Sequence, residues 1–145
     1  MTRIESDEWV IDKPANEVFE FLSNCNNLQQ LMPEQVTNWQ STTDDCSFTI
    51  AGMASLGMEI KERNPGQNIR VERKGKAPFD FVMNYEMQTV DAGKTKLKIA
   101  FDADLNPMLK MMAEKPLRNF LNTLAGNYKN LNQYIINYRC HFNCY

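Results

Sequence analysis

The sequence predicts one α+β domain in which a curved antiparallel β-sheet of about six to seven strands wraps around a long C-terminal helix. Three observations predict this class: segments in the middle of the chain alternate apolar and polar residues, two short helical segments precede them, and one long helical pattern follows. A one-sided sheet must cover its apolar face, so it is expected to pack on the apolar stripe of the helix. The 145 residues fit a single domain, expected at 1–138 and followed by a flexible tail at 139–145.

The first elements are expected to be a strand and two short helices. Residues 3–11 end in a Trp-Val-Ile run, which favours β-structure. Pro14 suits the first turn of a helix, where its missing N–H costs nothing. The apolar residues after it share one helical face: Ala15, Val18, Phe19 and Leu22. A second short helix is expected to end before Pro33.

A series of strands follows, and the alternation is clearest in the last two. In the segment 79–88, one face carries Phe79, Phe81, Met83, Tyr85 and Met87. In the segment 94–101, three lysines point outward, and the inward residues are Thr95, Leu97, Ile99 and Phe101. Alternation with period two over such lengths, with turns at short spacing, predicts an antiparallel sheet with one dry face.

The last third of the chain carries the longest helical pattern. Asn106 suits the N-cap and Pro107 the first helical position. The apolar stripe then steps by three and four residues: Leu117, Leu121, Leu124, Tyr128, Leu131, Ile135 and Tyr138. Pro116 removes one backbone hydrogen bond and is expected to kink or restart the helix.

Composition bounds the kind of partner. The formal net charge is −2 and the pI is about 5.4, which argues against nucleic acid because that binding needs a basic surface. No apolar run approaches the roughly 20 residues of a membrane span, and the charged start has no apolar targeting core. The expected location is therefore the cytoplasm.

The cysteines and the single histidine do not form a recognisable site. Cys25, Cys46, Cys140 and Cys144 are expected to remain thiols. The segment "CHFNC" contains His141 but lacks the spacing of a two-pair zinc motif. No metal or cofactor is expected, and a histidine so close to the end of the chain argues against a histidine-based triad.

The stretch "IDKPANEVFEFLSNCNNLQQLMP" near the start resembles the START-related superfamily, which includes pollen-allergen-like proteins, polyketide cyclases and lipid-transfer domains and is also called SRPBCC. Within it, "KPANEVFEFL" matches the usual first helix and "LMP" the end of the second. The resemblance covers residues 3–137 and is strongest to small bacterial members that carry no assigned activity. It implies a helix-grip fold with a hydrophobic cavity and, because the family has no universal catalytic motif, no particular reaction.

Methionines and aromatic residues are the candidates to line such a cavity. Met108, Met111 and Met112 lie beside Pro116, and the strands contribute Met53, Met58, Met83 and Met87. Methionine adapts its shape easily, which suits a pocket for a flexible apolar guest. The predicted lining comprises Trp39, Phe48, Met58, Phe81, Met83, Tyr85, Ile99, Phe101, Met108, Met112, Phe120 and Leu124.

Three functions follow from this arrangement. The first is binding or carriage of a small hydrophobic ligand, such as a lipid or a polyketide-like aromatic, with Tyr85 orienting it through its hydroxyl. The second is a cyclase- or hydrolase-like enzyme that uses an Asp, Glu or Tyr of the cavity. The carboxylates weighed for that role are Asp80, Glu86, Asp102 and Asp104. The third is a protein-interaction module with a vestigial cavity.

Overall fold

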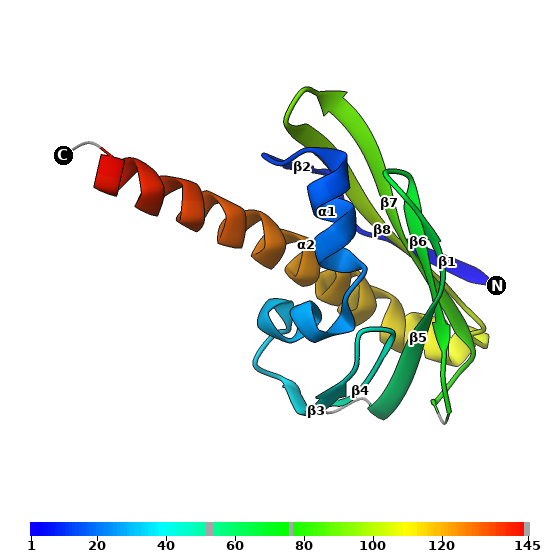
Figure 1. The fold of residues 1–145 in the computed structure, drawn as a ribbon. Coiled ribbons are helices and arrows are strands. Elements are labelled where there is room, and N and C mark those ends of the chain that lie inside the picture. The colour runs from blue at the N-terminus through cyan, green and yellow to red at the C-terminus, as the bar shows by residue number, and fades with distance from the viewer. Residues whose placement is uncertain (52–53, 76, 144–145) are drawn as a thin grey trace.

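The computed structural model describes residues 1–51, 54–75 and 77–143, including the side chains of all of them except residue 54 and residues 132–143. The elements, in chain order, are β1 (Thr2–Glu5), β2 (Trp9–Ile11), α1 (Ala15–Leu22), the 3₁₀ helix η1 (Cys25–Leu31), β3 (Val36–Ser41), β4 (Asp45–Ile50), β5 (Ala54–Asn64), β6 (Asn68–Arg73), β7 (Phe81–Asp91), β8 (Lys94–Ala103) and α2 (Pro107–Asn143). The sheet bends around the first half of α2 (Figure 1). The predicted α+β architecture is therefore confirmed.

In the described residues the sheet is antiparallel and has eight strands, one more than the upper end of the prediction. Seven of them follow the order β1-β8-β7-β6-β5-β4-β3, and β2 pairs with β8 beside β1. The additional strand arises because the predicted strand 3–11 is divided at Ser6. This buried residue takes the place of a ladder partner: its N–H donates to the Ile99 carbonyl at 2.8 Å, and its hydroxyl accepts from the Ile99 N–H at 2.9 Å.

Alternation along β7 and β8 produces one dry face, as the sequence predicts. In β7, every second side chain from Phe81 to Met87 is buried. In β8, the buried side chains include Thr95, Leu97, Ile99 and Phe101. On the opposite face, Lys98 lies 2.8 Å from Glu5 and Lys96 lies 3.6 Å from Glu8. Lys96 and Lys98 of β8 therefore belong to a solvated surface with paired charges.

The helix α2 begins where the sequence predicts. The Asn106 side-chain oxygen accepts a hydrogen bond from the Leu109 N–H at 2.9 Å, which caps the first turn. The helix continues through Pro116 as one element rather than restarting. Leu117, Leu121 and Leu124 of its stripe are buried, as is Tyr128, whereas Leu131 is half-buried. The stripe residues Ile135 and Tyr138 lie outside the described side chains, in the half of α2 that extends beyond the sheet (Figure 1).

The two short helices close one end of the sheet, on the same side as α2. Val18 and Leu22 of α1 are buried, and Asn127 of α2 donates to the Leu31 carbonyl of η1 at 2.7 Å. No helix in the described part of the chain is both long and apolar enough to cross a bilayer. The division of the chain at residue 138 stays a prediction, because the side chains from 132 onward are not described.

Candidate functional site

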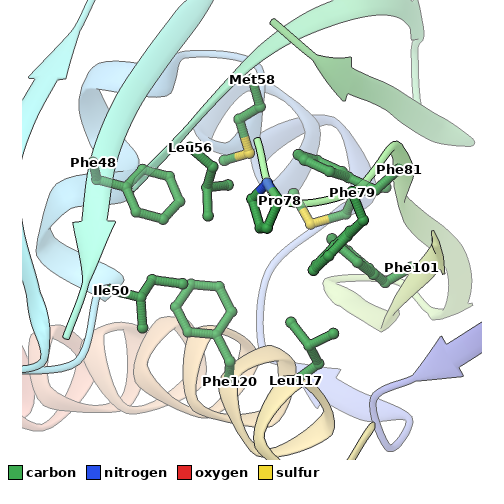
Figure 2. Close-up of a pocket in the computed structure, with 11 residues that line it drawn as sticks. Phe48, Ile50, Leu56, Met58, Pro78, Phe79, Phe81, Phe101, Leu117 and Phe120 are labelled. Carbon is green, nitrogen blue, oxygen red and sulfur yellow. The ribbon is translucent and has the colours of Figure 1, made fainter. Parts of the chain in front are cut away.

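The structure contains a small apolar cavity between the concave face of the sheet and α2 (Figure 2). Its volume is about 30 Å³. Its lining residues come from β4, β5, β7, β8, α2 and the segment before β7. They are Phe48, Ile50, Leu56, Met58, Pro78, Phe79, Phe81, Met83, Phe101, Leu117 and Phe120.

Aromatic rings form two walls of this cavity. On one side, the Phe81 and Phe101 rings stack at 4.9 Å between centroids, and the Phe79 ring meets each of them edge-on at 6.3 Å. On the other side, the Phe48 ring of β4 lies 6.4 Å from the Phe120 ring of α2, nearly parallel to it. Figure 2 shows the two groups of rings facing each other across the space. Stacked rings of this kind present flat apolar surfaces to whatever lies between them.

None of the described residues that line the cavity is titratable. Of the carboxylates weighed from the sequence, Asp102 and Glu86 lie on the outer face, where Arg3 binds both at 3.2–3.3 Å. Asp80 is paired with Arg73 at 3.2 Å, and Asp104 is exposed. The described residues around the cavity therefore supply no general acid or base to it.

Half of the predicted lining residues do border the cavity. These are Phe48, Met58, Phe81, Met83, Phe101 and Phe120. Tyr85, Ile99 and Leu124 are buried in the core beyond the cavity, and Trp39 stacks on Phe48 at 5.3 Å. Ligand contact by these residues stays a prediction.

The methionines at the start of α2 do not face the interior. Met108, Met111 and Met112 are 72%, 87% and 69% exposed. The prediction that Met108 and Met112 border the cavity is wrong, because these residues project from the outer side of the helix while Ala113 and Leu117 turn toward the core. Met58 and Met83 from the strands do line the cavity, whereas Met53 lies outside the described residues.

Five lining residues were absent from the prediction: Ile50, Leu56, Pro78, Phe79 and Leu117. Two of them carried a usable signal. Phe79 shares the apolar face of the alternating segment with Phe81, and Leu117 opens the stripe of the long helix. For Ile50, Leu56 and Pro78 no motif or period distinguishes a residue at a cavity from one in solid core.

A surface groove adjoins the cavity on the side of α2. Its volume is about 280 Å³, and it is lined by Pro33, Gln35, Ile50, Ala51, Pro116, Asn119, Phe120 and Thr123. Ile50 and Phe120 belong to both spaces and therefore separate them. Phe120 is half-buried and lies four residues after Pro116. The side chain between the cavity and the groove therefore lies one helical turn after the proline, whose missing N–H weakens the helix locally.

Tyr85 has its hydroxyl sealed in the core rather than at the cavity. The side chain is 1% exposed, and its oxygen has no hydrogen-bond partner in the described part of the chain. Burial raises the pKa of this phenol well above its ordinary value, and negative charge on the nearby Cys25 and Cys46 sulfurs would raise it further. The hydroxyl is therefore neutral and lies within electrostatic range of the two thiols.

Metal ligands are not gathered in the described residues, which contain no group of three His, Cys, Asp or Glu side chains able to hold an ion. The segment "CHFNC" lies outside the described side chains.

Comparison with known proteins identifies the fold. No family model matches the sequence, and no curated protein matches it. Among solved structures, a START superfamily protein from Mycobacterium smegmatis aligns with a TM-score of 0.67 at 12% identity, covering 89% of this chain and 98% of that one. Norcoclaurine synthase from Thalictrum flavum, a point mutant in complex with a transition-state analogue, aligns at 0.73 and 10% identity, covering 92% and 94%. The di-domain ARO/CYC BexL aligns at 0.64 and 15% identity, covering 88% of this chain and 46% of that one.

Identities this low establish shared architecture and not shared chemistry. These structures align with 88–92% of this chain, in which a bent antiparallel sheet holds a long C-terminal helix and two short helices follow the first strands. This chain therefore has the helix-grip fold of the START and polyketide-cyclase-like proteins.

Proposed function

We propose that this protein binds a compact hydrophobic ligand between the sheet and α2, in the apolar cavity and the groove beside it. The observation that carries the proposal is that the described lining of the cavity is wholly apolar, and that Ile50 and Phe120 line both this cavity and the outside groove. Structures that share this fold include a START superfamily protein and a synthase in complex with a transition-state analogue, which supports a ligand-binding role for the fold.

The size of the cavity limits what can bind without a change of shape. A volume of about 30 Å³ is far below the roughly 300–1,000 Å³ of ordinary ligand pockets. It is also smaller than the ~150 Å³ apolar cavity that accepts benzene in another protein. A ligand larger than a few atoms must therefore displace side chains.

Phe120 is the side chain best placed to move. Its ring is half-buried, and it forms the wall between the cavity and the 280 Å³ groove. Rotation of this ring would join the two spaces into one pocket near the lower end of the ordinary range. Pro116, one turn earlier, leaves one backbone hydrogen bond of the helix unmade, which lowers the cost of local adjustment.

The lining also indicates the chemistry of the ligand. Flat aromatic walls suit a planar or ring-containing apolar body. The groove adds the polar side chains Gln35, Asn119 and Thr123, which could hydrogen-bond a single polar end. We therefore expect a ligand with an apolar body and one polar tip, in preference to a long two-chain lipid.

A fluorescence titration with the apolar probe N-phenylnaphthylamine tests the proposal. Met83→Trp fills the cavity from β7 and should weaken probe binding at least tenfold. Phe120→Ala opens the wall and should speed association by a similar factor. Phe19→Ala is the matched control, because it removes another half-buried ring from a helix without touching the cavity, and it should leave binding unchanged.

Equal probe affinity for Met83→Trp and the unchanged protein would contradict this location for the site. Native mass spectrometry of freshly purified protein adds an independent measurement, because a retained ligand appears as extra mass that Met83→Trp should remove.

A protein-interaction role is the second candidate, and one observation favours it. Met108, Met111 and Met112 form an exposed apolar cluster on the first turns of α2, unusual for a surface that meets only water. Replacing all three by Gln should leave probe binding intact if the cavity is the site. Loss of a bound protein partner in that variant, with no ligand detected in any sample, would favour the interaction role.

A further inference from the structure

Cys25 of η1 and Cys46 of β4 bring two thiols together in the core. Both residues are free cysteines, 1% and 4% exposed, and their side chains are hydrogen-bonded to each other. We propose that Cys25 and Cys46 form a redox-active dithiol, which a small hydroperoxide converts into an internal disulfide. This site is separate from the cavity, since neither cysteine lines it.

Several bonds hold the two segments in register around the thiols. The Cys25 N–H donates to the Thr43 carbonyl in the turn before β4, at 3.0 Å. The Ser41 hydroxyl donates to the Asn26 side-chain oxygen at 2.7 Å. Because Ser41 pairs directly with Cys46 across the β3–β4 ladder, the neighbours of both cysteines are tied together. The backbone segments that carry the two thiols are therefore tied to each other.

Arg63 of β5 binds both segments that lead to the two cysteines. One of its terminal nitrogens donates to the Ser23 carbonyl at 2.8 Å and to the Asp44 carboxylate at 2.7 Å. The guanidinium thus bridges the chain just before Cys25 and the chain just before Cys46. It also places a positive charge near the Cys25 sulfur.

The two thiols differ in their surroundings. The hydrogen bond from the Cys46 thiol lowers the pKa of Cys25, and the charge of Arg63 adds to this effect. The same hydrogen bond, together with burial, raises the pKa of Cys46. Because the Arg63 guanidinium is bound to the carbonyl two residues before Cys25, we assign Cys25 as the nucleophile and Cys46 as the proton donor and resolving thiol.

Tyr85 provides a second, independent observation at this site. Its hydroxyl is buried, lacks a hydrogen-bond partner among the described residues, and lies within electrostatic range of both sulfurs. A buried donor without a partner costs free energy unless some state of the protein uses it. An oxidised or ionised Cys25 would offer the acceptor that the reduced, neutral pair lacks.

The reaction balances with one hydroperoxide. The Cys25 thiolate attacks the peroxide oxygen, the O–O bond breaks, and an alcohol leaves after taking up a proton, giving Cys25 sulfenic acid. The Cys46 sulfur then attacks the Cys25 sulfur, the S–O bond breaks, and water leaves. Two thiols and one hydroperoxide give one disulfide, one alcohol and one water; with hydrogen peroxide, the products are the disulfide and two waters.

Because both sulfurs are buried, only a small oxidant can reach them. Neither sulfur is reachable by a peptide disulfide in the closed structure, whereas a hydroperoxide is close to water in size. Short 3₁₀ helices such as η1 are held by weak hydrogen-bond geometry, so local opening at Cys25 gives access. Closing the covalent loop over residues 26–45 should raise the melting temperature by roughly 6–12 °C.

The test treats the full chain carrying Cys140→Ser and Cys144→Ser with hydrogen peroxide. Mass spectrometry of an unreduced digest should then show a cross-link between the peptides that contain Cys25 and Cys46. The melting temperature should rise with the cross-link and return to its starting value after dithiothreitol. Cys25→Ser is the control and should show neither change.

A second variant tests the assigned order. Cys46→Ser should leave Cys25 as a sulfenic acid that dimedone labels, whereas Cys25→Ser should leave Cys46 unlabelled. If both thiols stay unmodified in the folded protein at peroxide concentrations that oxidise them in urea, the proposal is overturned. The cross-link is measured in a protein that keeps both Cys25 and Cys46. The outcome therefore does not depend on whether the Cys25→Ser or Cys46→Ser variant folds.

Discussion

At the scale of single residues, Tyr85 has an unusual position. It is among the largest fully buried side chains, yet its hydroxyl has no partner among the described residues. The ring fills the core at the centre of β7, so its packing is favourable while its polar end is not. Substitutions at Tyr85 can therefore measure separately the stabilisation by the buried ring and the cost of the buried hydroxyl.

Tyr85→Phe should raise the free energy of unfolding of the reduced protein by about 1 kcal/mol, because it removes an unsatisfied donor without leaving a cavity. Tyr85→Leu also removes the ring and should lower stability by about 2 kcal/mol or more. Urea denaturation measures both changes. A clear loss of stability in Tyr85→Phe would mean that the hydroxyl has a bonding partner in solution.

At the scale of elements, α2 carries an internal proline without being divided. Pro116 is exposed and lies between the outward-facing methionines and the buried stripe. Its missing N–H leaves the carbonyl four residues earlier without its helical donor. The helix therefore contains one weak turn, directly before the ring of Phe120 that separates the cavity from the groove.

Pro116→Ala should raise the free energy of unfolding by about 1–3 kcal/mol, because alanine restores the donor and is the best helix former. Asn119→Ala, on an exposed position of the same helix, should give only about half a kcal/mol. Thermal and urea melts of the two variants provide the comparison. A decrease in Pro116→Ala would show that the proline ring is needed where it lines the groove.

At the scale of the whole molecule, charges on the outer face connect strands that are distant in sequence. Arg3 of β1 binds Glu86 of β7 and Asp102 of β8, and Glu5 of β1 binds Lys98 of β8 at 2.8 Å. Each pair is partly exposed, so each contributes less than about 1 kcal/mol. Together they hold the first strand of the chain onto the sheet.

The ion pairs of Glu5 predict how the stability of the protein changes at acidic pH. Hydrogen bonds from Lys98 and then Arg3 lower its pKa in the folded protein. The stabilisation is therefore complete above the ordinary carboxyl pKa of about 4.3, and it is lost as pH falls through the lowered folded value. Glu5→Gln should cost up to about 1 kcal/mol at neutral pH and almost nothing near pH 2.

Urea midpoints measured between neutral pH and pH 2 test this difference. Glu34→Gln is the control, since Glu34 is exposed and has no ion pair among the described residues. A Glu5→Gln penalty that stays constant across the pH range would show that the ion pair is absent in solution.

Much of the architecture follows from periodicity alone. The alternation from Phe81 to Met87 and the stripe from Leu117 to Tyr128 both predict the faces that the structure buries. These patterns are reliable because every second or every third-to-fourth residue must avoid water along the whole element. The N-cap at Asn106 was predictable for the same local reason.

The candidate site was only half predictable. Met108 and Met112 belong to an apolar segment, but only the three-dimensional arrangement decides that these turns face solvent. Ile50 and Leu56 border the cavity because neighbouring side chains fail to fill the space around them. That failure depends on how bulky groups from four strands, the segment before β7 and a helix interlock, which no single segment encodes.

The sequence by itself determined the order of the elements, their buried faces and the cap of the long helix, because these depend on interactions between near neighbours in the chain. The tertiary structure decided where the core is incompletely filled, which side chains close the cavity, and that Cys25 and Cys46 meet. These features join residues far apart in the chain, and their geometry exists only once the sheet has closed on the helix.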